Sequence, residues 1–180
     1  FGDFDSQNDF MRAPLDGGTI LTCFWGGMPN WYFQHMGMGE TIGYGEVLTD
    51  NNGNNLYDPA NPSAGQVHIA LMGDPTLRMT MVGPASNVLG SVNGSNITVT
   101  WSPSNDNVLG YHVYRYNAAL QSWQRLTTNA VTGTSYLDNV AGAGGQIRYM
   151  VRALKLEQTP SGTYYNLSTG AMGQANAGSQ

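Results

Sequence analysis

Two stretches in the second half decide the fold of this chain: Tyr111-His-Val-Tyr-Arg-Tyr116 and Ile147-Arg-Tyr-Met-Val-Arg-Ala-Leu154. Their side chains alternate in the period of two that is typical of a β-strand with one buried face. Asn96-Ile-Thr-Val-Thr-Trp101 repeats this alternation. Turn-forming residues separate the stretches at intervals of roughly 8–12 residues. The pattern predicts an antiparallel sandwich of about seven strands.

The alternation also predicts which side chains share a face of each strand. In the first stretch, one face is expected to carry Tyr111, Val113 and Arg115. In the second stretch, one face is expected to carry Tyr149, Val151 and Ala153. A short strand is expected at Ser135-Tyr-Leu-Asp138, before a glycine-rich turn.

These strands resemble those of a fibronectin type III domain. The matching features are Pro84 before the first strand, Val99-Thr-Trp101, Gly110-Tyr-His-Val-Tyr-Arg115 and Tyr149-Met-Val-Arg-Ala153. The resemblance covers about residues 84–176. It implies an all-β sandwich and leaves the function open, because this architecture serves many unrelated functions.

The first half has a mixed pattern. Thr19-Ile-Leu-Thr-Cys-Phe-Trp25 and Gln66-Val-His-Ile-Ala-Leu-Met72 are continuous apolar runs, which are typical of strands buried on both faces. Helical signals lie around them, so the half predicts part of an α/β sheet. About eighty residues with two strands and weak helices make a poor independent core, so we expect this half to need more chain or a partner.

Two helices are expected in this half. Ser6, with Asp9 three residues later, has the spacing of a capping box, and Pro14 should end that helix early. Asn30 is a candidate N-cap for a second helix that extends to Ile42, although three glycines weaken it.

The segment His68-Ile-Ala-Leu-Met-Gly-Asp-Pro-Thr-Leu-Arg78 resembles the end of the catalytic domain of gingipain-type, caspase-like cysteine peptidases. In that family an immunoglobulin-like domain follows, as a sandwich is expected to do here. Phe1-Gly-Asp-Phe4 and Phe10-Met-Arg-Ala13 resemble the stretch after the family's nucleophile. This resemblance covers about residues 1–80. It implies that the family's catalytic cysteine and histidine would precede Phe1, so no catalytic residue is carried over.

The two resemblances predict a mixed fold: a partial α/β segment followed by an all-β, fibronectin type III-like sandwich. The expected domains are residues 1–82, residues 83–176 and a tail of residues 177–180. Phe1 is not an initiator methionine, and no basic segment followed by an apolar one comes after it. We therefore expect a processed chain or a piece of a longer bacterial protein.

Composition excludes several classes of function. The chain has 180 residues, with 7 basic and 12 acidic side chains and a net charge of −5, so a nucleic-acid partner is not expected. It lacks an apolar run of about 18 residues that could span a membrane. A single cysteine excludes a disulfide scaffold. The low charge and abundant Gly, Asn, Ser and Thr favour a secreted β-rich protein.

A thiol–imidazole pair would need Cys23 together with His35 or His68. A cysteine nucleophile requires a base within hydrogen-bonding distance and a partly exposed, electropositive setting. Cys23 lies within an apolar run, so the interpretation as a core thiol is favoured. A satisfied core histidine is also the favoured interpretation of His68.

Calcium is the only cofactor that the sequence suggests. Asp50, Asn52, Asn54 and Asp58 have ligand-like spacing, but the loop lacks the sixth-position glycine and the twelfth-position glutamate of an EF-hand. A second cluster of carboxylates, which would also suit a capped helix start, comprises Asp3, Asp5 and Asp9.

Glycan is the alternative ligand, because exposed aromatic rings stack on sugar rings. The candidates are Trp25, Trp31 and Trp123, although the first two belong to an aromatic cluster that favours a core.

Three functions follow from the sequence. The leading one is a non-catalytic, extracellular or cell-surface C-terminal fragment of a gingipain-type homologue, which acts as a structural or interaction module with an upstream peptidase segment or another protein. The alternatives are a carbohydrate-binding accessory module of an extracellular polysaccharide-degrading enzyme and a small hydrolase that uses Cys23.

Overall fold

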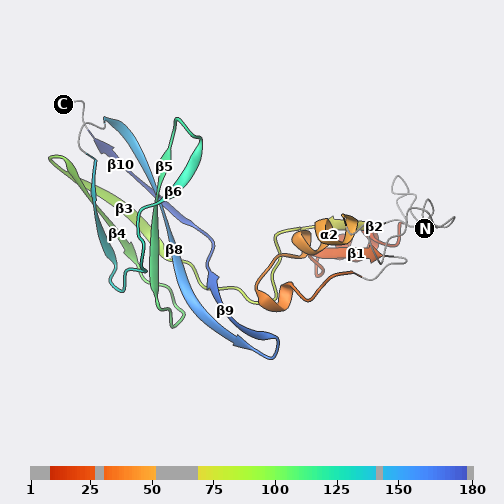
Figure 1. The fold of residues 1–180 in the computed structure, drawn as a ribbon. Coiled ribbons are helices and arrows are strands. Elements are labelled where there is room, and N and C mark those ends of the chain that lie inside the picture. The colour runs from red at the N-terminus through yellow and green to blue at the C-terminus, as the bar shows by residue number, and fades with distance from the viewer. Residues whose placement is uncertain (1–8, 27–30, 52–68, 141–143, 178–180) are drawn as a thin grey trace. The chain divides into compact units, whose positions relative to one another are not determined.

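The computed structural model describes residues 9–26, 31–51, 69–140 and 144–177. The chain forms two compact units (Figure 1). The first unit consists of Phe1–Thr80 with Thr159–Gly162, and the second consists of Met81–Gln158 with Thr163–Gln180. No helix of the described ranges is long and apolar enough to cross a membrane.

The second unit is a sandwich of two antiparallel sheets, with strand orders β3-β4-β7 and β10-β8-β5-β6. The bounds of these strands are β3 Ser86–Asn93, β4 Asn96–Ser102, β5 Gly110–Asn117, β6 Ser122–Arg125, β7 Ser135–Asn139, β8 Gly145–Thr159 and β10 Ala171–Ala177. β3 and β4 lie in one sheet and β5 and β6 in the other, so the chain crosses between the sheets from β4 to β5 and returns from β6 to β7. This crossing order makes the unit a fibronectin type III-like sandwich, and the predicted fold class is confirmed.

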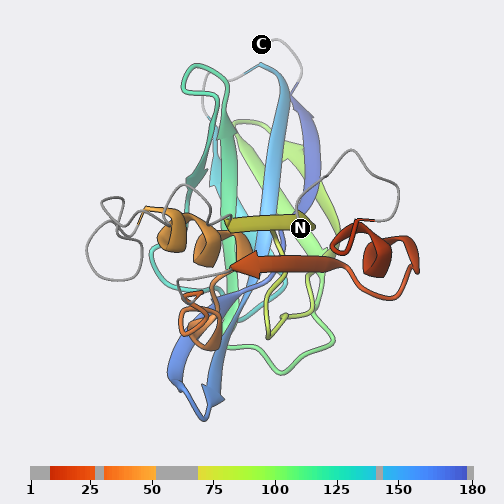
Figure 2. The same ribbon diagram turned by 90° about the vertical axis from the view of Figure 1, so that its right-hand side faces the viewer.

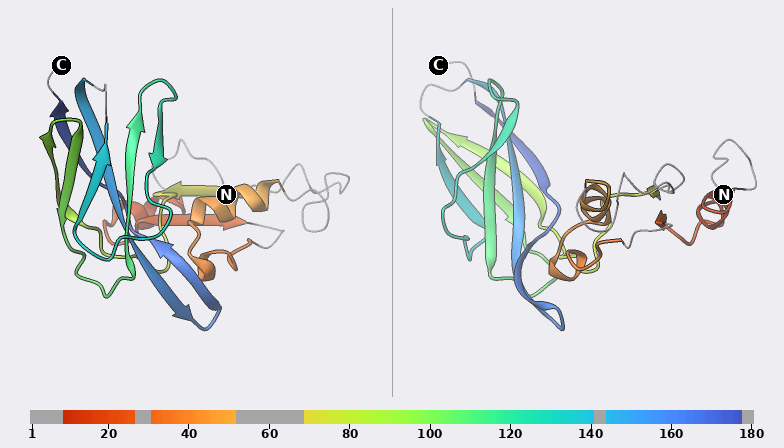
Figure 3. Two further views of the ribbon diagram at one scale, coloured as in Figure 1. Left: turned by 60° about the vertical axis from the view of Figure 1, so that its left-hand side comes forward. Right: turned by 45° about the vertical axis from the view of Figure 1, so that its right-hand side comes forward.

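The strands are joined by tight turns where the sequence places turn residues. β3 and β4 pair up to Asn93 and Asn96, and Gly94 lies in the turn between them with φ = 58°. A residue without a Cβ adopts this left-handed conformation at no steric cost. β8 is the longest strand, and β9 (Gly162–Leu167) pairs with it alone, as the blue hairpin in Figure 3 shows.

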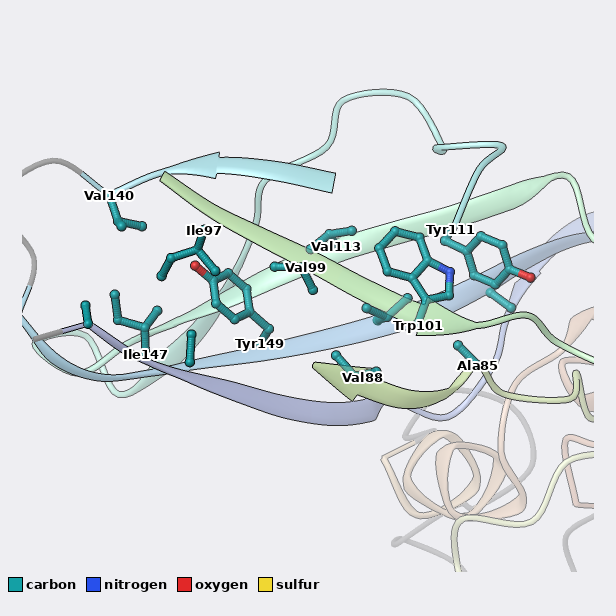
Figure 4. Packing of buried hydrophobic residues seen from close by; sticks show 14 of the residues in the cluster. Ala85, Val88, Ile97, Val99, Trp101, Tyr111, Val113, Val140, Ile147 and Tyr149 are labelled. Carbon is teal, nitrogen blue, oxygen red and sulfur yellow. The ribbon is translucent and has the colours of Figure 1, made fainter. Parts of the chain in front are cut away.

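The two sheets enclose the hydrophobic core (Figure 4). Ile97 and Val99 from β4, Val113 from β5, and Tyr149 and Val151 from β8 are all 0% exposed. Burying a side chain of this size contributes roughly 1.5–3 kcal/mol relative to leaving it exposed. The inward faces are those of the predicted shared sets, although His112, on the opposite face of β5, is buried as well.

The Trp101 and Tyr111 rings extend this core, with ring centroids 5.4 Å apart in an edge-on arrangement (Figure 4). Aromatic pairs favour this geometry because it places a positive ring edge against a negative face. The Tyr111 hydroxyl accepts a hydrogen bond from the Ser104 backbone N–H at 2.9 Å, so its polar end is satisfied.

In the first unit, β1 (Thr22–Gly26) and β2 (Ile69–Gly73) pair antiparallel and lie side by side (Figure 2). Both strands lie where the apolar runs predict them, but the expectation that β1 is buried on both faces is wrong. Phe24 is 40% exposed, and Leu21, just before the strand, is 64% exposed. The reason is that, in the described part of this unit, two strands and short helices provide too few elements to cover both faces of the pair.

The helices of this unit begin later than the sequence predicts. α1 spans Arg12–Asp16, and Pro14 lies within it rather than ending it. Proline is tolerated there because the first backbone N–H groups of a helix have no partner within the helix. The Asp9 carboxylate accepts hydrogen bonds from the N–H groups of Met11 at 2.8 Å and Arg12 at 3.2 Å, so it supports the start of α1.

The second predicted helix is split in two. A short 3-10 helix, η1 (Met36–Met38), ends at Gly39, which has φ = 92°. α2 (Ile42–Asp50) then begins after Thr41, whose side-chain oxygen accepts a hydrogen bond from the Tyr44 N–H at 3.1 Å. Threonine is a favoured N-cap, and the glycines of this segment weaken a continuous helix. Residues 31–35 are not helical, and the predicted cap Asn30 lies outside the described residues, as does Ser6, the predicted cap of the first helix.

Candidate functional site

A polar bridge joins the two sheets of the sandwich. Arg115 of β5 donates from Nη1 to both carboxylate oxygens of Asp138 of β7, at 3.0 and 2.8 Å. The Tyr149 hydroxyl of β8 donates to Asp138 Oδ2 at 2.8 Å. Asp138 is buried, so the guanidinium and the hydroxyl replace the water that its charge would otherwise need.

The electrostatics of this bridge keep Tyr149 protonated. Burial of the hydroxyl raises the pKa of Tyr149 well above its ordinary value, and the hydrogen bond and charge of Asp138 raise it further. The group is therefore a hydrogen-bond donor at all physiological pH values. The Tyr149 hydroxyl and the Arg115 guanidinium together satisfy the buried Asp138 carboxylate, and this arrangement stabilises the sandwich.

Next to the bridge lies a hollow of about 350 Å³. The polar residues that line it are Arg115, Tyr116, Asn117, Gln124, Asn139 and Gln146. Four of these carry carboxamides, which both donate and accept hydrogen bonds. The Asn117 oxygen already accepts from the backbone N–H groups of Ala119 and Leu120. The hollow therefore suits a small polar ligand better than an apolar one.

On the outer face of the larger sheet, three side chains form a row across neighbouring strands. Tyr116 of β5 pairs with Trp123 of β6, and their ring centroids are 5.4 Å apart. The Arg148 guanidinium of β8 lies over the Tyr116 ring, 3.7 Å from its centroid. Tyr116 also lines the hollow, so we call the hollow together with Trp123 and Arg148 the Tyr116 site.

His112 lies on the same strand as Tyr116 but is buried. Its Nδ1 lies 3.0 Å from the Thr127 hydroxyl oxygen. Burial lowers the pKa of His112, and the charge of Arg125 lowers it further, while the contact with Thr127 acts in the opposite direction. The fold thus disfavours the charged form of His112.

The residues predicted for thiol chemistry lie in the first unit. Cys23 is half-buried on β1, directly opposite Met72 of β2. The His35 ring packs edge-on against Tyr44, with centroids 5.6 Å apart. Among the residues that the structure describes, no hydrogen bond joins Cys23 to an imidazole; His68 lies outside them.

Of the predicted calcium ligands, Asp50 is exposed at the last position of α2, while Asn52, Asn54 and Asp58 lie outside the described residues. In the second cluster Asp3 and Asp5 are likewise outside, and Asp9 supports α1. The described ranges contain no group of three histidine, cysteine, aspartate or glutamate side chains that could hold a metal ion.

The three tryptophans predicted for glycan stacking lie in different environments. Trp31 is 8% exposed and packs against Phe24 and Phe33, at centroid distances of 5.1 and 5.9 Å. Trp25 is half-buried beside Phe10, and Trp123 is half-buried in the Tyr116 site. Trp123 packs against Tyr116, which lines the polar hollow.

The sequence analysis assigned no role to the bridge or the hollow. One signal was present: Arg115 shares a predicted face with Tyr111 and Val113, and a charged residue on a core face requires a buried partner. Asp138, at the end of its short strand, is that partner. The hollow had no comparable signal, because it is formed by strand ends that are far apart in sequence.

No protein-family model matches the chain. Among solved structures it is similar to the crystal structure of FN3tt, with 12% identity and a TM-score of 0.42 over 56% of this chain and 98% of that one. A Fn3-like protein from Clostridium thermocellum has 20% identity and a TM-score of 0.39, over 53% and 94% of the two chains. A crystal structure of titin domains has 14% identity and a TM-score of 0.40, over 61% and 36%. The strand order and register, rather than these likenesses, carry the assignment of the fold.

Proposed function

We propose that the chain is the non-catalytic C-terminal part of a secreted gingipain-type cysteine peptidase homologue, and that it acts as a structural and interaction module. The observation that carries this proposal is the incomplete cover of the first unit. Leu21, just before β1, and Phe24, within β1, are 64% and 40% exposed. Large apolar side chains at a short sheet are the surface that a further segment of an α/β domain would cover.

The transition from β2 to the sandwich supports the same origin. β2 ends at Gly73, and the next residues form a tight turn in which Asp74 Oδ1 accepts hydrogen bonds from the Thr76 N–H at 2.8 Å and the Thr76 hydroxyl at 2.6 Å. Asp74 and Thr76 belong to the motif that resembles the end of the peptidase domain. Cys23 has the surroundings of a structural thiol, beside a methionine on a paired strand.

The exposed apolar surface can be tested with the dye ANS, which binds such surfaces. Leu21 and Leu89 are matched, at 64% and 63% exposed, but the first lies beside β1 and the second in the sandwich. We expect L21S to lower ANS fluorescence of the intact chain clearly and L89S to leave it nearly unchanged. Equal effects of the two substitutions would contradict the proposal.

The proposed lack of peptidase activity is tested with casein and with fluorogenic arginine and lysine peptides as substrates. The proposal predicts no hydrolysis by the purified chain and no difference for C23S. Turnover that C23S abolishes would instead support the small hydrolase.

A second candidate function is glycan binding by the sandwich. It is favoured by one feature, the carboxamide-lined hollow beside Trp123 and Tyr116. Sugar hydroxyls donate and accept hydrogen bonds as carboxamides do, and aromatic rings cover their apolar faces. This function is compatible with the first, because it concerns the other unit.

A further inference from the structure

We propose that the Tyr116 site binds a sugar that carries a carboxylate, with the sugar ring in the hollow and its carboxylate on Arg148. This inference rests on the glycan-binding function proposed second above, and adds the chemical class of the ligand and the residue that selects it.

Arg148 is held in a geometry that suits a planar anion. Its guanidinium lies over the Tyr116 ring, 3.7 Å from the centroid, and 6.0 Å from the centroid of the Trp123 ring. Stacking occupies a face of the guanidinium and leaves the N–H groups at its edge to donate to a ligand. A carboxylate accepts two such parallel hydrogen bonds, so a side chain fixed by stacking loses less freedom on binding than a mobile lysine would.

Within the described residues, the charge of Arg148 is not neutralised by an acidic side chain. In the described part of the chain Arg148 forms no ion pair, whereas Arg115, which lines the hollow, is paired with Asp138. Residues 81–180 contain five basic and three acidic side chains, a net charge of +2, although the whole chain has a net charge of −5. The site therefore lies in the positive part of an acidic protein, which favours an anionic ligand over a neutral one.

The hollow provides the second half of the recognition. Gln124 and Gln146 are exposed side chains from β6 and β8 at its rim, and both can donate and accept hydrogen bonds. A volume of about 350 Å³ lies within the range of small-molecule sites. A ligand rich in hydroxyls would form hydrogen bonds with these side-chain amides. A short acidic peptide would need Arg148 but would use few of the amides.

The test uses tri-galacturonic acid and its fully methyl-esterified form, in which each carboxylate is replaced by an uncharged methyl ester. Each is titrated into the ¹⁵N-labelled intact chain, and amide shifts are followed by NMR. We expect the acid to bind about tenfold or more tightly than the ester, a difference typical of one charge-assisted bidentate contact.

Three variants locate the effect. R148Q should remove the preference for the acid, and R148K should restore only part of it because an ammonium lacks the planar fork. The matched control is R125Q, which removes an exposed arginine from β6 of the same sheet and should keep the preference. Q124A should weaken acid and ester alike.

The outcomes separate the two proposals. If acid and ester bind equally in the wild type, glycan binding stands and the carboxylate inference is overturned. If neither saccharide shifts any resonance of the hollow, both are overturned. Binding of a hexaglutamate peptide that depends on Arg148, without saccharide binding, would also overturn the inference and assign the site to acidic peptides.

Discussion

The two units of this chain bury apolar side chains to very different degrees. β1 comes from one of the most continuously apolar stretches of the chain, yet Phe24 on it is 40% exposed. The sandwich strands alternate apolar and polar residues, yet Val99 and Val113 are 0% exposed. Three- and five-stranded sheets that face each other close a core, and a two-stranded pair does not. An apolar stretch thus predicts side chains that are favoured to be buried. The number of strands and helices that pack against the stretch decides whether they are buried.

The largest expected effect is loss of the sandwich core. W101A should lower the free energy of unfolding by roughly 3–5 kcal/mol, because it leaves a cavity beside Tyr111. F24A, in the first unit, should change it by less than about 1 kcal/mol because the ring is already partly in water. Urea denaturation followed by circular dichroism measures both. Equal losses would remove the distinction between the units.

The polar bridge should rank second. D138A removes the shared acceptor of Arg115 and Tyr149, and we expect a cost of about 3 kcal/mol, at the low end for a broken buried pair because Arg115 is partly exposed. Y149F should cost about 1.5 kcal/mol, since it removes one hydrogen bond to a charged group and keeps the ion pair. The order would be contradicted if Y149F were the more damaging in the same denaturation experiment.

Close packing of β10 on β3 gives a smaller effect. A Cβ added at Gly173 would lie 2.1 Å from the Val88 carbonyl oxygen, which is too close without a backbone shift. G173A should therefore destabilise the sandwich by roughly 1–3 kcal/mol. The control is G133A, because nothing lies within 4 Å of a Cβ there, and its melting temperature should stay near that of the wild type.

The smallest expected effect is a pH dependence from His112. Because burial lowers the pKa of His112, the unfolded chain takes up a proton first as the pH falls through about 6.5. The sandwich should thus be less stable at pH 5.5 than at pH 7.5. H112Q should reduce this difference in melting temperature. An unchanged difference would assign the pH dependence to another group.

The sandwich could be predicted from sequence, and the site could be predicted only in part. Alternation in Tyr111–Tyr116 and Ile147–Leu154 reports burial on one face of a strand, which is a local property. The partners of Arg115 and Arg148 depend instead on how distant strands meet. The first unit shows the same limit: Asp9 and Thr41 support helix starts that the sequence analysis placed at Ser6 and Asn30, because several capping residues compete within a few positions.

Hydrogen exchange of the intact chain, followed by mass spectrometry, tests the central claim most directly: the sandwich closes its own core, and the first unit lacks part of its cover. Backbone amides exchange through local opening, whose free energy depends on packing. We predict that peptides from β4, β5 and β8 exchange at least about a hundredfold more slowly than those from β1 and β2, a difference of about 2.8 kcal/mol in opening free energy. Protection of β1 and β2 equal to that of β4 would contradict the account.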